Sequence, residues 1–240
     1  MYPASKIALR RSDFSSILLA LLTLFLVTAC ERVDMDAAEN SKELQDKETV
    51  VVLRTNRGDI TVRFFPETSP EHVKNFIAHS ESGFYVNTLF HRVIPGFMIQ
   101  GGDPNTKDDD PGNDGKGGYS YKGEGTSLQA EFNEIPHTRG ILSMARNQNI
   151  NSAGSQFFIM HQDFPQLNGQ YTVFGEVIDG IDVVDHIVNT PRNHRDRPMQ
   201  DQRIEQTIVE EWPSVDVEKT KSAMWKEHPI AQAQSDKSED

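Results

Sequence analysis

The chain has 240 residues, of which 36% are hydrophobic and 25% are charged, and its formal net charge at pH 7 is −12. This length accommodates one full-sized domain with appendages, and the apolar content suffices for one core. The acidic balance argues against a nucleic-acid-binding function, because neutralising phosphates requires clustered Lys and Arg. Outside the extreme N-terminus, the only basic stretch is a short one from Arg192 to Arg197.

The N-terminus is predicted to be a targeting segment. Three basic residues, Lys6, Arg10 and Arg11, precede an apolar run from Ile17 to Val27 that contains one polar residue. A stretch this short does not reach the roughly 20 residues that span a bilayer. A positive segment followed by a short apolar run is typical of a signal peptide, which we assign to residues 1–29.

The single cysteine of the chain, Cys30, follows directly after this segment. The tetrapeptide Val27-Thr28-Ala29-Cys30 resembles the lipobox of bacterial lipoproteins, in which the cysteine is lipidated and becomes the first residue. Because the cysteine is alone, it has no intramolecular disulfide partner. We therefore predict a lipoprotein anchored to a membrane through Cys30 and facing the periplasm. An ordinary cleaved secretory signal fits the same run.

Three further regions follow the predicted signal peptide. Residues 30–48 are rich in acidic side chains and have little apolar periodicity, which predicts a flexible tether. The folded domain is expected over residues 49–212. From 213 to 240 the chain turns polar, which predicts a largely disordered tail.

The domain is predicted to begin with a β-hairpin. Two β-rich runs, at 50–55 and 59–64, are joined through Asn56-Arg57-Gly58, with Gly58 supplying a positive φ. A helix is then expected from Ser69 as its cap and Pro70 in its first turn. Its buried face is formed by Val73, Phe76 and Ile77.

A second helix and a series of short strands complete the predicted domain. The helix follows Gly180, and its apolar face consists of Ile181, Val184, Ile187 and Val188. Short β-like runs occur at 88–93, 97–100, 141–145, 156–160, 171–177 and 203–211. Many short strands with only two helices predict a mainly β fold. We expect a closed eight-stranded antiparallel β-barrel capped by two α-helices.

Two runs carry the functional signal. Phe90 to Asp103 contains one arginine, two large apolar side chains and a glutamine, and ends in a Gly-Gly turn; the second run is Gly154 to Ile159. Neither run holds a nucleophile beside a base, a metal-ligand pair or a phosphate loop. Such a pattern suits a site that grips a small apolar ring and directs hydrogen bonds to its amide, as in an X-Pro peptide.

Together the two runs resemble the cyclophilin family of peptidyl-prolyl cis-trans isomerases. The resemblance covers roughly Val50 to Val209 and is dense at 90–103, 141–160 and 169–180. It implies isomerisation of X-Pro bonds in unfolded or newly translocated proteins, a chaperone-like role and no cofactor. We expect a monomer whose partners are proline-containing extended polypeptides, with the membrane reached through the lipid.

The resemblance also implies roles for individual residues. Arg92 is the catalytic candidate, because a fixed guanidinium beside the nitrogen of a twisted amide stabilises the twisted state more than the planar one. Gln100 matches the glutamine that orients this arginine. The substrate-binding residues are predicted to be Phe97, Met98, Ala145, Arg146, Gln156, Phe158, Leu167 and Tyr171. Strand alternation sends Phe97 and Met98 to opposite faces unless a bend, for example at Gly96, redirects one of them.

Two positions depart from the family pattern, and two rival functions stay open. Gln166 stands where cyclosporin-sensitive members carry Trp, so weak cyclosporin binding is expected. Tyr171 stands where many members carry His, and its ring and hydroxyl can still form a wall of the pocket. The same pocket could serve a proline-motif binding module or chaperone that does not require turnover. A lipocalin-like carrier is disfavoured, because it needs a hollow barrel. The eight histidines have no short metal-ligand spacing, so no metal site is predicted.

Overall fold

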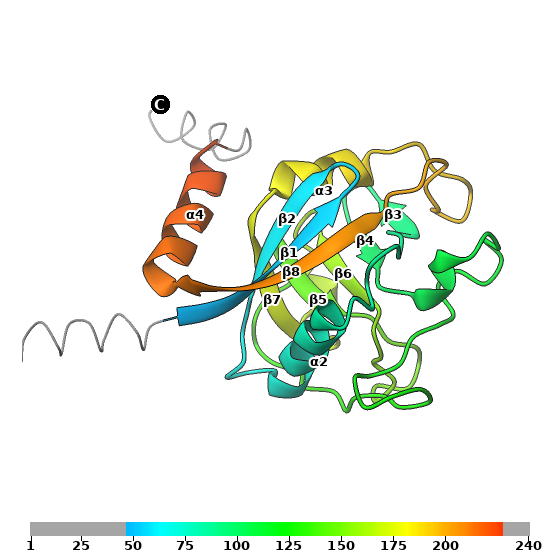
Figure 1. The fold of residues 1–240 in the computed structure, drawn as a ribbon, viewed down its shortest axis with the longest axis horizontal. Coiled ribbons are helices and arrows are strands. Elements are labelled where there is room, and N and C mark those ends of the chain that lie inside the picture. The colour runs from blue at the N-terminus through cyan, green and yellow to red at the C-terminus, as the bar shows by residue number, and fades with distance from the viewer. Residues whose placement is uncertain (1–46, 228–240) are drawn as a thin grey trace, which may run out of the picture. The chain divides into compact units, whose positions relative to one another are not determined.

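The computed structural model of the protein describes residues 47–227 (Figure 1). The predicted signal peptide, Cys30, nearly all of the predicted tether and the last thirteen residues, 228–240, lie outside the described residues. The chain divides into one unit that ends at Lys47 and a second that begins at Glu48. The description below concerns the second unit.

One eight-stranded sheet forms the centre of the described part of the chain. Its strands are β1 (Lys47–Thr55), β2 (Gly58–Phe64), β3 (Arg92–Ile94), β4 (Met98–Gly101), β5 (Ile141–Met144), β6 (Phe157–Met160), β7 (Val173–Asp179) and β8 (Ile204–Pro213). The helices are α2 (Pro70–Glu81), α3 (Ile181–Val188) and α4 (Ser214–Glu227), with short 3-10 turns η1 (Pro104–Lys107) and η2 (Pro165–Leu167). The mainly β, eight-stranded antiparallel prediction is confirmed.

Closure of the predicted barrel needs a correction. The strand order is β3-β4-β6-β5-β7-β2-β1-β8, so β3 and β8 form the two edges of the sheet. The edges are joined by the segments that precede them: Leu89 and Arg203 form an isolated antiparallel bridge, and the Phe90 N–H donates to the Gln202 carbonyl at 2.8 Å. The Ile204 N–H also donates to the Thr88 carbonyl at 2.9 Å, so the segment before β3, rather than β3 itself, pairs with the start of β8.

The core lies on one face of the sheet, and a second apolar cluster lies on the other. Along β6, Phe157 and Ile159 belong to the core, whereas Phe158 and Met160 belong to the second cluster. This is the alternation expected of a strand with two covered faces. The core is filled by aromatic side chains, including Phe76 at 5.1 Å from Phe157 between ring centroids. A filled interior is inconsistent with the hollow barrel of a small-molecule carrier.

The first hairpin and the α3 helix form as predicted. Residues 50–55 of β1 pair in antiparallel register with 58–63 of β2. Gly58 has a φ of 131°, and a Cβ there would lie 2.8 Å from a methyl group of Val183 in α3. Glycine is therefore required both by the turn and by the close packing of α3. The four apolar residues predicted for the helix face, Ile181, Val184, Ile187 and Val188, are all buried.

The start of α2 differs from the prediction in its cap. Pro70 occupies the first turn as expected, but Ser69 makes no capping hydrogen bond; its hydroxyl donates instead to the Val173 carbonyl at 2.6 Å. The cap is Glu131, a residue distant in sequence. Its carboxylate accepts the N–H groups of Glu71 at 3.2 Å and His72 at 3.1 Å, and its Oε2 lies 2.6 Å from His72 Nδ1.

Replacing Glu131 by alanine is expected to lower the free energy of unfolding by about 2 kcal/mol. The change leaves two helix N–H groups and a buried imidazole without their partner, and the lost cap and the unsatisfied groups each destabilise the fold. Chemical denaturation would measure the loss. Glu134→Ala is the control, because Glu134 is an exposed residue of the same loop. Equal stability of the two variants would contradict the capping role.

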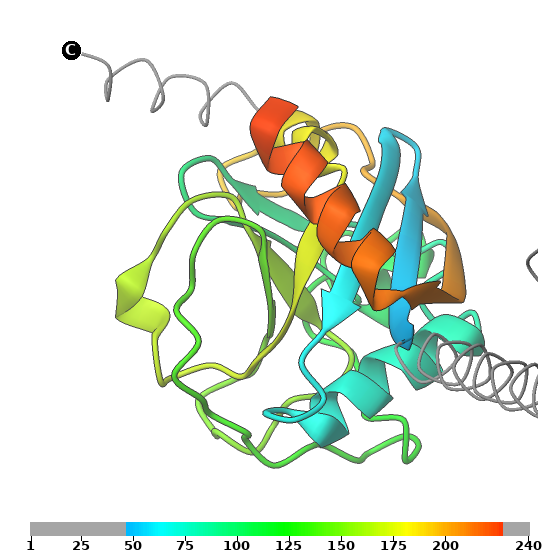
Figure 2. The ribbon, with the colours of Figure 1, turned by 90° about the vertical axis from the view of Figure 1, so that its left-hand side faces the viewer.

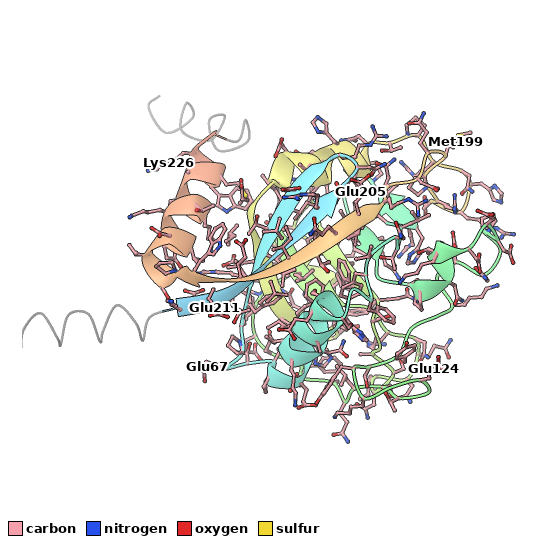
Figure 3. The ribbon with its side chains drawn as sticks, in the orientation of Figure 1. Glu67, Glu124, Met199, Glu205, Glu211 and Lys226 are labelled. Carbon is pink, nitrogen blue, oxygen red and sulfur yellow. The ribbon has the colours of Figure 1, made fainter. Side chains whose placement is uncertain are left out.

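The predicted disordered tail is wrong for Ser214–Glu227, which forms α4. Val217 of this helix is fully buried in a small cluster with Val50 and Ile178, and Met224 joins the main core. Figure 2 shows α4 lying across the sheet beside β7, and Figure 3 labels Glu211 near its start and Lys226 near its end. The segment is polar overall, yet Val217, Met224 and Trp225 stand at positions i, i+7 and i+8, which is the spacing of one helical face.

The folded domain also begins slightly earlier than predicted, since β1 starts at Lys47 rather than at residue 49. Within residues 47–227, no helix combines the length and apolar character needed to cross a bilayer.

Candidate active site

A small cavity of about 120 Å³ opens on the face of the sheet opposite the core. Every residue predicted for the site lines it, except Gln156: the lining consists of Arg92, Phe97, Met98, Gln100, Ala145, Arg146, Phe158, Leu167 and Tyr171. Gln156 lines a groove that adjoins this cavity and shares Gln100, Ala145 and Arg146 with it. The structure therefore gathers the whole predicted set in one place.

Strand pairing explains how residues far apart in sequence meet here. Arg92 of β3 pairs with Gln100 of β4, and Gln100 pairs with Phe158 of β6. Directly opposed residues of an antiparallel sheet point to the same face with neighbouring Cβ atoms. The guanidinium, the amide and the aromatic ring consequently form one row across three strands.

A relay of side-chain amides holds the arginine. Arg92 Nη1 donates to Gln100 Oε1 at 3.2 Å, and Gln100 Nε2 donates to Gln156 Oε1 at 3.0 Å. Gln156 Nε2 in turn donates to the Gly117 carbonyl at 2.8 Å. Each glutamine amide accepts one hydrogen bond through its oxygen and donates one through its nitrogen. The relay therefore anchors the half-buried guanidinium to the Gly117 backbone.

The charge of Arg92 is not neutralised by the described part of the chain. No carboxylate within residues 47–227 lies within ion-pair distance of its guanidinium. Its Cζ lies 6.0 Å from the centre of the Phe97 ring, at the outer limit of a cation–π contact. The remaining guanidinium donors are thus available to a ligand in the cavity.

The bend proposed near Gly96 is present. Gly96 has a φ of 79°, and the Phe97 N–H donates to the Ile94 carbonyl at 3.0 Å, which closes a turn between β3 and β4. Phe97 belongs to this turn, whereas Met98 is the first residue of β4. Strand alternation therefore does not separate them, and both line the cavity.

The opposite wall consists of two aromatic rings and a second arginine. The rings of Phe158 and Tyr171 meet edge to face at 5.7 Å. Arg146 lies with its Cζ 4.5 Å from the centre of the Tyr171 ring, and it donates to the Gln170 carbonyl through Nη2 at 2.9 Å. These contacts hold the Arg146 side chain against the Tyr171 ring, at the rim of the cavity.

His137 supports this wall and was not anticipated from the sequence. The buried ring lies nearly parallel to Phe158 at 6.1 Å and edge-on to Tyr171 at 6.5 Å. Its Nε2 lies 3.0 Å from the hydroxyl of Ser143 on β5, and its backbone N–H donates to Asn168 Oδ1 at 2.8 Å. A histidine four residues before a predicted strand carries no distinctive sequence signal, because its role depends on cross-strand neighbours.

Four buried histidines predict that the domain loses stability in mild acid. Burial lowers the pKa of His72, His79, His91 and His137 from the ordinary value of 6.5. A histidine with a lowered folded-state pKa takes up its proton more readily in the unfolded chain, so unfolding is favoured as the pH falls below about 6.5. Each contributes up to about 1.36 kcal/mol per pH unit between its unfolded and folded pKa values.

Denaturation midpoints measured between pH 7.5 and pH 5.5 would test this. We expect the midpoint to decline across that range, and a constant or rising midpoint would contradict the prediction.

The fold and cavity define a class of protein: an antiparallel β-sheet domain that presents a guanidinium beside a small apolar pocket on its outer face. A sequence model of the family described as "Cyclophilin type peptidyl-prolyl cis-trans isomerase/CLD" matches residues 50–209. The chain belongs to the cyclophilin family, and it is a peptidyl-prolyl cis-trans isomerase.

Curated relatives and solved structures agree with this assignment. Peptidyl-prolyl cis-trans isomerase B of Escherichia coli is 42% identical over 177 residues, which cover 68% of this chain and all of that protein. A probable peptidyl-prolyl cis-trans isomerase of Brucella abortus is 47% identical over 146 residues, 59% of this chain and 72% of that protein. A cyclophilin-type isomerase structure from Cryptosporidium parvum is 40% identical with a TM-score of 0.61, covering 67% of this chain and 98% of that one.

Proposed function

We propose that this isomerase acts on X-Pro bonds of unfolded or newly translocated polypeptides, with Arg92 as its catalytic residue. The observation that carries the proposal is a guanidinium without a carboxylate partner in the described chain, held by two glutamines at the edge of an apolar pocket. The related Cryptosporidium structure was determined in the presence of the dipeptide Ala-Pro. This supports a proline ring as the occupant of the pocket formed by Phe97, Met98 and Phe158.

The mechanism follows from what changes during rotation of the amide. A planar X-Pro amide delocalises its nitrogen lone pair, and rotation costs ~18–20 kcal/mol because this resonance is lost. In the twisted state the lone pair is localised and accepts a hydrogen bond better. Arg92 donates to it at that point, while the apolar walls hold the ring and exclude water. The stabilisation therefore applies more to the transition state than to either planar isomer.

The required energy is within reach of this arrangement. Uncatalysed exchange takes roughly tens to hundreds of seconds, and shortening it to milliseconds needs about 10⁴-fold, or about 5–6 kcal/mol. One charged hydrogen bond in a partly desolvated pocket, together with positioning of the ring, supplies energies of this size. Neither a covalent intermediate nor a cofactor enters the scheme.

The direct test follows relaxation of a cis-enriched X-Pro peptide in the presence of the protein. Acceleration that saturates with peptide concentration supports the proposal. Binding of the peptide without acceleration would instead support the proline-motif binding module.

We also propose that the chain is a lipoprotein, anchored through Cys30 and facing the periplasm. The proposal rests on the basic segment, the short apolar run and the small residues that precede the single cysteine. Replacing Cys30 by serine is expected to move the protein from the membrane fraction to the soluble fraction and to abolish labelling by a fatty acid. Unchanged membrane association of Cys30→Ser would overturn the lipid anchor.

A further inference from the structure

A second and larger cavity, of about 550 Å³, opens beside the proline pocket. The two cavities share Arg92 and Gln100. The larger cavity lies between the loop that follows η1 and the loop that joins α3 to β8; both loops lie at the same end of the sheet (Figure 1), and Figure 3 labels Met199 on the second one. Its volume is in the range of cavities that hold ligands.

The lining of this cavity is basic, although the whole chain is acidic. It contains four permanent cations, Arg92, Lys116, Arg195 and Arg197, and a single carboxylate, Asp114. The basic stretch from Arg192 to Arg197, which the reaction mechanism does not use, supplies two of the four. In a chain with a net charge of −12, such a concentration of positive charge in a concave surface favours an anionic ligand.

Most of this charge is not paired within the protein. Asp114, whose side chain is 8% exposed, forms an ion pair with Arg197 at 2.6 Å, and this neutralises one cation. Within residues 47–227, no carboxylate lies within ion-pair distance of Lys116 or Arg195, as is also true of Arg92. Three cations therefore line the cavity without an acidic partner from the described chain.

The loop that carries Arg195 is held in place by its own contacts. Asn193 Oδ1 accepts the N–H groups of Arg195 at 2.8 Å and Arg197 at 3.2 Å. The Asp196 carbonyl accepts the N–H of Val93 at 2.8 Å, which ties the loop to β3 next to Arg92. The 2.6 Å pair between Arg197 and Asp114 joins it to the loop opposite. A site held in advance loses less entropy when a ligand binds.

We propose that this cavity is a subsite for an acidic residue of the substrate, an Asp or Glu close in sequence to the isomerised proline. The proposal rests on the proposed function, since it places the proline in the pocket beside Arg92. Each residue of an extended peptide spans about 3.3–3.6 Å, so a chain leaving that pocket past Arg92 reaches the second cavity within about three residues. Its carboxylate then meets Arg195 and Lys116.

The test uses the full-length chain in mild detergent and a set of neutral peptides with one proline. Glu, Gln or Lys is placed at one position at a time, from three residues before the proline to three residues after it, and kcat/KM is measured at low salt. Glu is expected to exceed Gln by about threefold to fivefold, as for a partly exposed ion pair, on one side of the proline only. Lys is expected to fall below Gln at the same position.

Arg195→Gln should reduce the Glu-to-Gln ratio to near one. The matched control is Arg192→Gln, which removes the same charge from the same loop; Arg192 pairs with Asp196 at 3.1 Å and does not line the cavity. This control should keep the preference.

Three results would overturn the subsite. They are turnover without a preference for Glu, an equal preference on both sides of the proline, and a preference that survives in Arg195→Gln. If none of the peptides is turned over, including the neutral one, the proposed function itself fails.

Discussion

Replacing Arg92 by alanine is expected to lower kcat for X-Pro isomerisation by about 10²–10³-fold, with a much smaller change in KM. This is the size of effect seen when one donor to a developing charge or lone pair is removed from an enclosed site. KM changes little because the apolar walls, which hold the proline ring in both planar isomers, stay in place. An interaction made only in the transition state appears in kcat.

Two further variants separate the role of Arg92 from a general loss of positive charge. Arg92→Lys keeps the charge but not the planar fork that Gln100 orients through Nη1, so most of the loss should persist. Arg146→Ala removes an arginine from the same cavity, but one whose guanidinium is occupied by Tyr171 and the Gln170 carbonyl. Its effect should be severalfold at most.

The measurement is the relaxation rate of a cis-enriched peptide over a range of enzyme and peptide concentrations. Full activity of Arg92→Ala would remove the electrostatic mechanism. An equal loss in Arg92→Ala and Arg146→Ala would attribute the effect to the overall field of the site rather than to one directed hydrogen bond.

Replacing Val217 by aspartate is expected to lower the free energy of unfolding by about 3 kcal/mol. Val217 has no exposed surface and packs against Val50 of β1 and Ile178 of β7. Burying a Val-sized side chain contributes about 1.5–3 kcal/mol, and a carboxylate cannot replace it there without a partner. The helix should detach from the sheet and lose its other contacts as well.

Those other contacts include two ion pairs with the sheet. Glu218 pairs with Arg63 of β2, and Lys221 pairs with Glu176 of β7 at 2.8 Å. Partly exposed pairs of this kind contribute up to about 1 kcal/mol each. Detachment would also expose Met224, which is buried in the main core.

The matched control lies on the same helix. Val215 is 57% exposed, so Val215→Asp should change stability by less than about 0.5 kcal/mol. Chemical denaturation measures both variants. Because no residue of α4 lines the proline pocket, Val217→Asp should keep its isomerase activity under conditions where it stays folded. Equal stability of the two variants would show that α4 does not contribute to the folded domain.

The sequence by itself determined the features that depend on local pattern. The hairpin follows from β-rich runs flanking Gly58, and α3 follows from apolar residues at helical spacing. The resemblance to a known family, and not local pattern alone, pointed to the site residues; Arg92, Phe97, Met98 and Gln100 lie together because their segment forms one strand–turn–strand unit. Alternation along Gln156 to Met160 likewise separates core from pocket, because successive side chains of a strand point to opposite faces.

Only the tertiary structure decided the features that depend on distant partners. Glu131 caps α2 from fifty-nine positions beyond His72, and this leaves Ser69 to bond elsewhere. The polar segment of α4 folds because β1 and β7 supply the surface that covers Val217. Helix propensity is a local property and does not include the stabilisation that this burial gives. The role of His137 and the presence of the basic cavity could not be predicted from the sequence either. His137 acts through its cross-strand neighbours, and the cavity forms between two loops that are remote in sequence. Burial and charge pairing belong to the assembled chain, so they cannot be read from any one segment.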